Sequence, residues 1–144
     1  MMGSSPLINC KLLVDNYQIR LTPEQLLKIR DELLIEPFQK NKFKNGAKEL
    51  THKYKYELGL KAAIATSSSK QNFENKTNYL KSRLNEDIDI VITSDSRGVK
   101  EGKPAPDIYL LATKELGINP EERIAFEDSI SGVQDQLEQG PVLL

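Results

Sequence analysis

A lysine held in a short loop is the first residue of this chain with a clear chemical use. Lys103 lies between Gly102 and Pro104. Proline restricts the backbone around it, so the ammonium is presented from a loop of reduced freedom. A point charge in that place can stabilise a phosphoryl group and an attacking carboxylate. An ordinary exposed lysine is the alternative interpretation of this segment.

A pair of carboxylates forms the second segment of this kind. Glu127 and Asp128 directly follow the apolar residues 124–126. Carboxylates at the end of a buried strand are costly unless they are paired or bound to a metal. Mg²⁺ takes one or two carboxylates together with substrate phosphate and water. Glu127 and Asp128 are therefore candidate metal ligands, and an acidic turn that caps a helix is the alternative.

A hydroxyl-rich loop forms the third segment. Thr66, Ser67 and Ser68 follow four apolar residues and precede a predicted helix. Hydroxyl groups and the free N–H groups of such a loop can hold a phosphate oxygen. Thr66 and Ser67 are candidate phosphate-binding residues, although serine and threonine are also common in loops that bind nothing.

The elements that must position these side chains alternate between strands and helices. Strands are expected at 60–65, 88–92, 123–126 and 142–144, and helices at 23–35, 47–58, 72–84, 107–116 and 131–139. The first helix is expected to end at Glu36-Pro37 because proline disfavours helix in the residue before it. This alternation predicts βαβ units and a parallel sheet. Ligands bind at the carboxyl ends of such strands, so Thr66, Asp95 and Glu127-Asp128 are expected at one edge of one sheet.

Composition excludes several classes of partner. The 144 residues suit one domain, and 20 basic against 21 acidic residues leave a net charge of −1. That balance gives no general attraction to nucleic acid or to an anionic membrane. No apolar run approaches the roughly 20 residues of a transmembrane helix, and a single cysteine, Cys10, fits a reducing compartment. We expect a cytoplasmic protein that binds neither nucleic acid nor membrane.

From Leu13 to nearly its end the chain resembles the haloacid dehalogenase-like hydrolase superfamily. Within it, the chain is most similar to the group of pseudouridine-5′-phosphatase and small sugar- or polyol-phosphate phosphatases. The residues that carry the resemblance are Ala65-Thr66-Ser67-Ser68, Phe73 with Lys76-Thr77, Gly102-Lys103-Pro104-Ala105-Pro106-Asp107-Ile108-Tyr109, and Phe126-Glu127-Asp128-Ser129 with Gly132-Val133. The resemblance implies an α/β fold, with a Rossmann-like core whose parallel sheet is flanked by helices. Residues 1–45 would then be the remnant of a helical cap, and residues 46–144 a partial core.

The same resemblance implies a chemistry and residue roles. It implies Mg²⁺-dependent hydrolysis of a small phosphomonoester, of the sugar- or polyol-phosphate type, through an aspartyl-phosphate. Thr66 matches the phosphate-binding residue of the family, and Lys103 matches the lysine that steadies nucleophile and phosphate. Asp128 matches the metal-binding acid, with Glu127 beside it. A phosphomutase of the same family is a second and less favoured enzymatic interpretation.

One part of the family pattern has no counterpart here. The family opens with a strand that ends in an Asp-x-Asp motif and supplies the nucleophile. Asp15 is the only early candidate, and we interpret it as an acid of a cap helix. We therefore expect a truncated or degenerate member that is inactive alone, with an exposed sheet edge that recruits a partner or a second copy. A non-catalytic fragment or pseudoenzyme that binds phosphate is the alternative.

Overall fold

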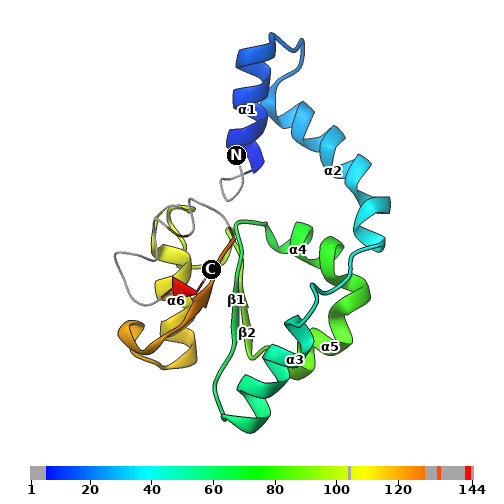
Figure 1. The fold of residues 1–144 in the computed structure, drawn as a ribbon. Coiled ribbons are helices and arrows are strands. Elements are labelled where there is room, and N and C mark those ends of the chain that lie inside the picture. The colour runs from blue at the N-terminus through cyan, green and yellow to red at the C-terminus, as the bar shows by residue number, and fades with distance from the viewer. Residues whose placement is uncertain (1–5, 104, 129–132, 134–141, 144) are drawn as a thin grey trace.

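The protein is described from a computed structural model, which covers residues 6–103, 105–128, 133 and 142–143 (Figure 1). The helices are α1 (Pro6–Tyr17), α2 (Pro23–Gln39), α3 (Ala47–His52), α4 (Lys70–Thr77), α5 (Lys81–Asp87) and α6 (Asp107–Leu116). Three short turns of other helix types are η1 (Lys53–Glu57), η2 (Asn78–Leu80) and η3 (Pro120–Glu122). The strands are β1 (Ala63–Ala65), β2 (Ile90–Ile92), β3 (Ala125–Phe126) and β4 (Val142–Leu143).

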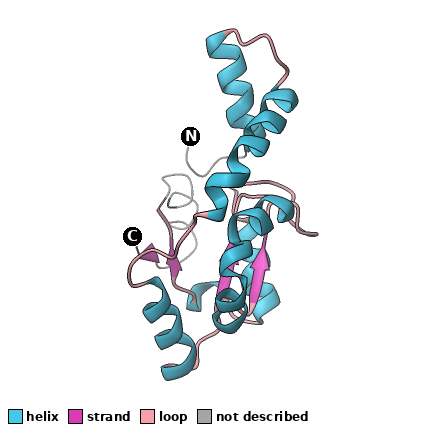
Figure 2. Cartoon of the chain, turned by 90° about the vertical axis from the view of Figure 1, so that its right-hand side faces the viewer, coloured by secondary structure: helices cyan, strands magenta, loops and turns pink. Residues whose placement is uncertain are grey.

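The first two helices form an arm that projects away from the strands (Figures 1 and 2). Helix α2 begins as the sequence predicts: Gln25 N–H donates to Thr22 Oγ1 and Thr22 N–H donates to Gln25 Oε1, which forms a capping box. The predicted end at Glu36-Pro37 is wrong, because the helix runs on to Gln39. Proline removes one N–H from the helix, and here the last turn is closed beyond it, by Lys40 N–H donating to the Pro37 carbonyl.

The described strands form two separate parallel pairs. In the first, Ala63 of β1 lies opposite Ile90 of β2, and in the second, Ala125 of β3 lies opposite Val142 of β4. The α/β class with parallel strands is therefore confirmed. The prediction of one continuous sheet is wrong for the described residues, because no strand among them forms hydrogen bonds with both pairs.

The core lies between helix α6 and the first strand pair. Ile108 is fully buried, and with Ile92, Tyr109 and Ala112 it forms the central apolar cluster. Ala63, Ala65, Ile90, Val99 and Leu111 pack against this cluster from its edges. Helix α6 has the predicted bounds, and it ends where Gly117 takes up a left-handed conformation with φ of 65°. The core therefore fixes the carboxyl ends of β1 and β2 relative to α6.

Two predicted helices are interrupted. The segment predicted at 47–58 is α3 followed by the π-helical turn η1, and the segment predicted at 72–84 divides into α4, η2 and α5. The helix predicted at 131–139 lies outside the described residues except for residue 133. Within the described part of the chain, no helix has the length and apolar character needed to cross a membrane.

Candidate active site

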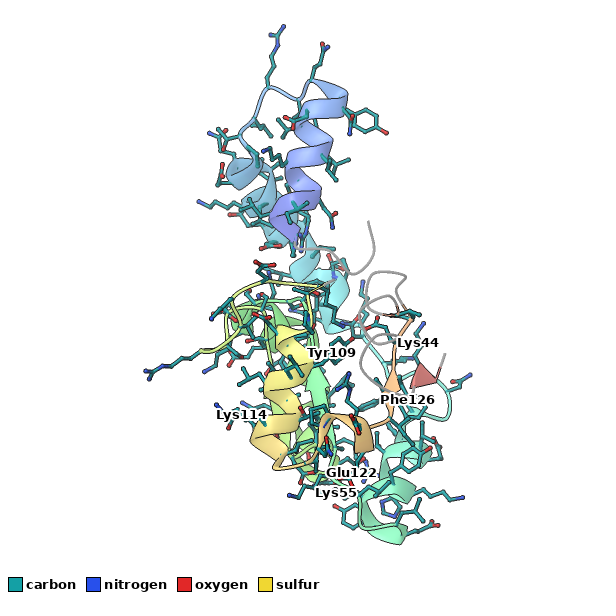
Figure 3. All side chains as sticks on the ribbon, turned by 90° about the vertical axis from the view of Figure 1, so that its left-hand side faces the viewer. Lys44, Lys55, Tyr109, Lys114, Glu122 and Phe126 are labelled. Carbon is teal, nitrogen blue, oxygen red and sulfur yellow. The ribbon has the colours of Figure 1, made fainter. Side chains whose placement is uncertain are left out.

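The structure brings Lys103 and Glu127 together. Lys103 Nζ lies 2.6 Å from Glu127 Oε2, and the exposed fractions of the two side chains are only 6% and 8%. Tyr109 Oη donates to the same oxygen over 2.5 Å. Figure 3 shows Tyr109 on α6 and Phe126, the residue before Glu127, on β3. A buried ion pair, completed by a phenol, therefore stands at the carboxyl end of β3.

The loop that carries Lys103 is tied to the first turn of α6. The carboxylate of Asp107 accepts hydrogen bonds from the backbone N–H groups of Lys100 and Glu101, at 2.8 and 3.0 Å. These two hydrogen bonds hold the pKa of Asp107 below its usual range. Ala105 N–H donates to the Gly102 carbonyl and closes the turn around Lys103. The loop is thus fixed by the Asp107 carboxylate and by a backbone hydrogen bond of its own.

The hydroxyl loop lies at the carboxyl end of β1, as the sequence predicts. Thr66 N–H donates to the Ile92 carbonyl at 2.9 Å, which continues the β1–β2 pairing. Thr66 Oγ1 accepts the Ser68 N–H at 3.2 Å. Ser68 is buried, its carbonyl accepts the Ser94 N–H, and its Oγ accepts a hydrogen bond from Lys76 Nζ at 2.8 Å. Thr66 and Ser67 are half-buried on this supported loop.

Asp95 has a structural role at the end of β2. Its Oδ1 accepts hydrogen bonds from Thr93 Oγ1 at 2.7 Å and from Lys70 N–H, the first residue of α4, at 2.8 Å. Thr93 and then the Lys70 N–H hold the pKa of Asp95 below its usual range. Asp95 and Ser69, which accepts the Asn72 N–H, together satisfy free N–H groups of α4. The N–H groups of Lys70 and Asn72 therefore already have hydrogen-bond acceptors within the protein.

The two candidate metal ligands differ in their surroundings. Asp128 is exposed, whereas Oε2 of Glu127 already accepts two hydrogen bonds. Among the described residues, no cluster of three or more His, Cys, Asp or Glu side chains could hold a metal ion. Mg²⁺ commonly uses only one or two protein carboxylates with phosphate and water. Asp128, a hard oxygen donor beside the Lys103–Glu127 pair, fits that requirement as one ligand. Ser129 and Pro104, also part of the motif, lie outside the described residues.

Three aspartates that could be considered as a nucleophile, Asp15, Asp87 and Asp89, have other surroundings in the structure. Asp15 is exposed on α1, within the arm, and its interpretation as a cap-helix acid stays a prediction. An Asp-x-Asp sequence does occur at Asp87-Ile88-Asp89, but it precedes β2 instead of following a strand. The buried Asp87 accepts a hydrogen bond from Thr51, and Asp89 pairs with Lys55 at 2.6 Å. Asp87 thus links α5 to α3, and Asp89 links the start of β2 to η1.

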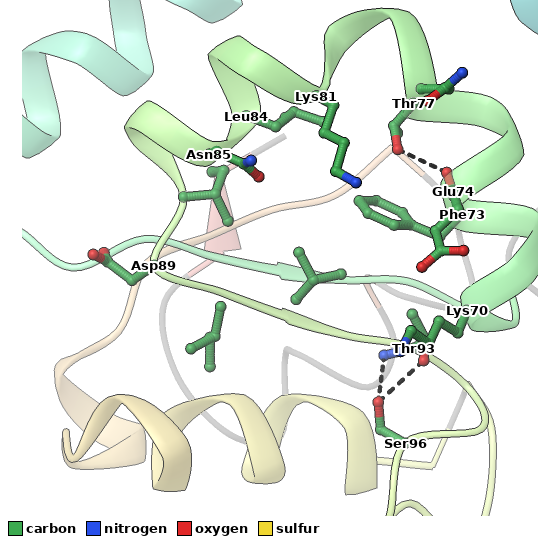
Figure 4. Close-up of a pocket in the computed structure, with 14 residues that line it drawn as sticks. Lys70, Phe73, Glu74, Thr77, Lys81, Leu84, Asn85, Asp89, Thr93 and Ser96 are labelled. Carbon is green, nitrogen blue, oxygen red and sulfur yellow. Dashed lines mark hydrogen bonds between the residues drawn. The ribbon is translucent and has the colours of Figure 1, made fainter.

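A pocket of about 600 Å³ lies beside this site, between the helices α4 and α5 and strand β2 (Figure 4). Lys70, Thr93 and Ser96 line its end nearest the carboxyl end of β2. Neither Thr66 nor Lys103 nor Glu127 contributes to its walls. The pocket is therefore a neighbour of the candidate site and not the site itself.

Two residues to which the sequence assigned no role are part of the arrangement. Tyr109 and Lys76 both lie inside the segments that carry the family resemblance. The signal that was available is their place in these segments, because each lies on the helix that follows a loop that could bind phosphate. Only the folded chain shows that Tyr109 reaches Glu127 and that Lys76 reaches Ser68.

Comparison with known proteins gives a consistent result. The chain is 32% identical over 139 residues to the mitochondrial (DL)-glycerol-3-phosphatase 1 of Arabidopsis thaliana, which covers 93% of the chain and 46% of the relative. It is 30% identical over 132 residues to the bifunctional riboflavin kinase/FMN phosphatase of the same plant, covering 92% of the chain and 34% of the relative. The chain thus spans about half or less of the length of these curated relatives.

A solved structure supports the same assignment. CbbY from Rhodobacter sphaeroides, in complex with phosphate, is 27% identical with a TM-score of 0.69, over 86% of this chain and 56% of that one. The model of the family described as "haloacid dehalogenase-like hydrolase" matches residues 6–134 of this chain. The matched region holds the hydroxyl loop, the lysine loop and the carboxylate pair, and it covers most of the sequence. The chain therefore belongs to the haloacid dehalogenase-like hydrolase family.

Proposed function

We propose that the chain is part of a Mg²⁺-dependent phosphatase that hydrolyses a small phosphomonoester of the sugar- or polyol-phosphate type. The observation that carries the proposal is the buried Lys103–Glu127 ion pair beside the exposed Asp128. An ammonium that is fixed and shielded from water stabilises developing negative charge far better than an exposed lysine does. Its place in the family motif and the phosphatase names of two relatives support the same chemistry.

Each residue of the site has a proposed role. Thr66 and Ser67 bind phosphate oxygens through their hydroxyl groups, which can donate hydrogen bonds. Lys103 offsets the charge of the phosphoryl group and of the attacking carboxylate. Asp128, with Glu127 beside it, holds Mg²⁺, which supplies charge neutralisation at the phosphoryl oxygens.

The nucleophile comes, in this proposal, from a strand that joins the two strand pairs. β1 and β3 belong to different pairs, and no strand of the described residues connects them. A further strand between them would satisfy free strand edges and would present an aspartate beside Lys103. A longer form of the protein, a partner chain or a second copy are the possible sources of this strand. A protein without it would bind phosphate and turn over little or no substrate.

A chain that binds phosphate without catalysis is the second candidate function. The observation that favours it is that Asp15, Asp87 and Asp89 are placed or engaged in ways unsuited to attack. The first candidate requires Mg²⁺-dependent turnover once the missing strand is present. The second requires phosphate binding only.

The test combines binding and turnover on the purified chain. Inorganic phosphate is titrated by calorimetry with and without Mg²⁺, and hydrolysis of p-nitrophenyl phosphate is followed in parallel. We expect Lys103→Ala and Thr66→Ala to weaken phosphate binding by about tenfold or more, as loss of a charged hydrogen bond predicts. Asp128→Ala should remove the effect of Mg²⁺. If the folded wild-type chain binds no phosphate under either condition, the proposed function is wrong.

A further inference from the structure

The side chain of Tyr109 completes a buried cluster with Lys103 and Glu127. Its hydroxyl donates to Glu127 Oε2, the oxygen that also pairs with Lys103 Nζ. In addition, Lys103 Nζ lies 4.6 Å from the centroid of the Tyr109 ring. Tyr109 therefore contacts both members of the ion pair, one through its hydroxyl and the other through its ring face.

These contacts fix the lysine from two directions. An ammonium over an aromatic face is attracted by the ring quadrupole, and more strongly when water is excluded. The carboxylate is held by a second donor, so its rotation would break the hydrogen bond from a buried phenol as well as the ion pair. All three side chains are at most 8% exposed. The position of the Lys103 ammonium is thus determined by Tyr109 as well as by Glu127.

Tyr109 also connects the two halves of the candidate site. Its side chain belongs to the core cluster with Ile92 and Ile108, against which Ala65 packs. Ala65 is the last residue of β1 and immediately precedes Thr66. The hydroxyl of the same side chain reaches Glu127 at the end of β3. Tyr109 therefore belongs to the core cluster that supports the end of β1 and also bonds to the anchor of the lysine.

We propose that Tyr109 is a positioning residue that holds the Lys103 ammonium in register with the hydroxyl loop for recognition of a phosphate group. The role is exerted through Glu127 and through the ring face, without contact between Tyr109 and the phosphate. The consequence for phosphate recognition rests on the function proposed above, but the positioning of Lys103 is measurable without it.

The first arm of the test measures Lys103 directly. Lysines are acetylated with acetic anhydride at fixed pH, and the rate at each position is read by mass spectrometry after digestion. Tyr109→Phe keeps the ring and removes the hydroxyl, and we expect acetylation of Lys103 to become about threefold to tenfold faster, since a hydrogen bond to a charged group is lost. Tyr79→Phe, at a tyrosine that is 62% exposed, is the matched control and should leave that rate unchanged.

A second variant protects the test against misfolding. Glu127→Gln keeps the shape of the acceptor and removes its charge, so it should also expose Lys103 to acetylation. Circular dichroism identifies any variant that has lost its fold, and the acetylation rate of the exposed Lys40 checks that the reagent acts equally in every sample. Equal Lys103 rates in folded wild-type and Tyr109→Phe protein would overturn the inference, whatever the phosphate result. Equal rates for folded Glu127→Gln would overturn it as well.

The second arm measures the consequence for phosphate. Titration of inorganic phosphate into Tyr109→Phe should show affinity reduced by about threefold to tenfold, while Tyr79→Phe binds as wild type. A wild-type chain that binds no phosphate contradicts the proposed function, and the acetylation arm still decides the role of Tyr109. Normal phosphate affinity in Tyr109→Phe, with Lys103 released, would contradict the part of the inference that concerns phosphate recognition.

Discussion

Lys76 Nζ lies 2.8 Å from Ser68 Oγ, so a lysine on α4 supports the loop that follows β1. The same ammonium lies 5.5 Å from the centroid of the Phe38 ring on α2, and Asn41 Nδ2 donates to the Lys76 carbonyl. Lys76 thus joins three parts of the molecule: the arm, helix α4 and the hydroxyl loop. Its environment leads to the first prediction.

The stability of the protein should rise with pH in the alkaline range because of Lys76. Burial, and then the charge of Arg30, lower the pKa of Lys76, against an opposing effect of Asp31. The unfolded chain therefore binds more protons than the folded one just below the ordinary lysine pKa of about 10.4, so the free energy of unfolding increases as pH rises through that window. Lys76→Met should flatten this slope, as measured by urea unfolding at several pH values.

Lys48→Met provides the control for this experiment. Lys48 is exposed and lies over the Phe43 ring, at 5.2 Å, so the substitution removes a comparable cation–aromatic contact away from Ser68. It should leave the alkaline slope as in wild type. The same slope in Lys76→Met and wild type would show that Lys76 is not buried in the way the structure describes.

The Lys103–Glu127 pair should contribute strongly to stability when one partner alone is removed. Both side chains are almost fully buried, so Lys103→Met leaves a carboxylate in the interior. Loss of one partner of a buried ion pair costs about 3 to 5 kcal/mol. The pair Lys40–Glu36 serves as the comparison, because its side chains are 74% and 78% exposed. Lys40→Met should lower the free energy of unfolding by about 1 kcal/mol or less. Equal losses in urea unfolding would contradict the burial of the first pair.

Asp89 should make the stability depend on pH in the acid range. The hydrogen bond from Lys55, and then the one from the Ala62 N–H, hold the pKa of Asp89 below its usual range. The stabilisation is present above the ordinary pKa of about 3.9 and is lost as pH falls through the lower folded value. Asp89→Asn should reduce stability near neutrality by about 1 kcal/mol and flatten the acid slope. Phosphate affinity should not change, because Asp89 precedes β2.

Asp15 should be dispensable for chemistry. It is exposed on α1, whereas the candidate site is built by the loop after β1, the residues after β3, the loop before α6 and Tyr109 of α6. Asp15→Asn should therefore bind phosphate as wild type does and leave any hydrolysis of p-nitrophenyl phosphate unchanged. Loss of Mg²⁺-dependent turnover in this variant alone would identify Asp15 as the nucleophile and overturn the assignment of this residue to the arm.

Local sequence signals predicted a helix end correctly where that end depends mainly on the residues beside it. The end of α6 follows from Gly117, and the start of α2 follows from the capping box of Thr22 and Gln25. Signals at helix ends act within a few residues, so the sequence alone shows them. The end of α2 was missed because the effect of Pro37 depends on where it lies in the last turn, and the division of 72–84 into α4 and α5 has no comparably clear marker.

The sequence by itself determined the family, the parallel α/β character and the identities of Thr66, Lys103, Glu127 and Asp128 as the residues of interest. Motif spacing is a property of the chain, so these conclusions need no coordinates. Only the tertiary structure decided that Lys103 pairs with Glu127, that Tyr109 donates to the same oxygen and that Lys76 supports Ser68. Each of these contacts joins residues from different elements, and the register of a strand against a helix is set by packing of the whole core, which no local pattern specifies.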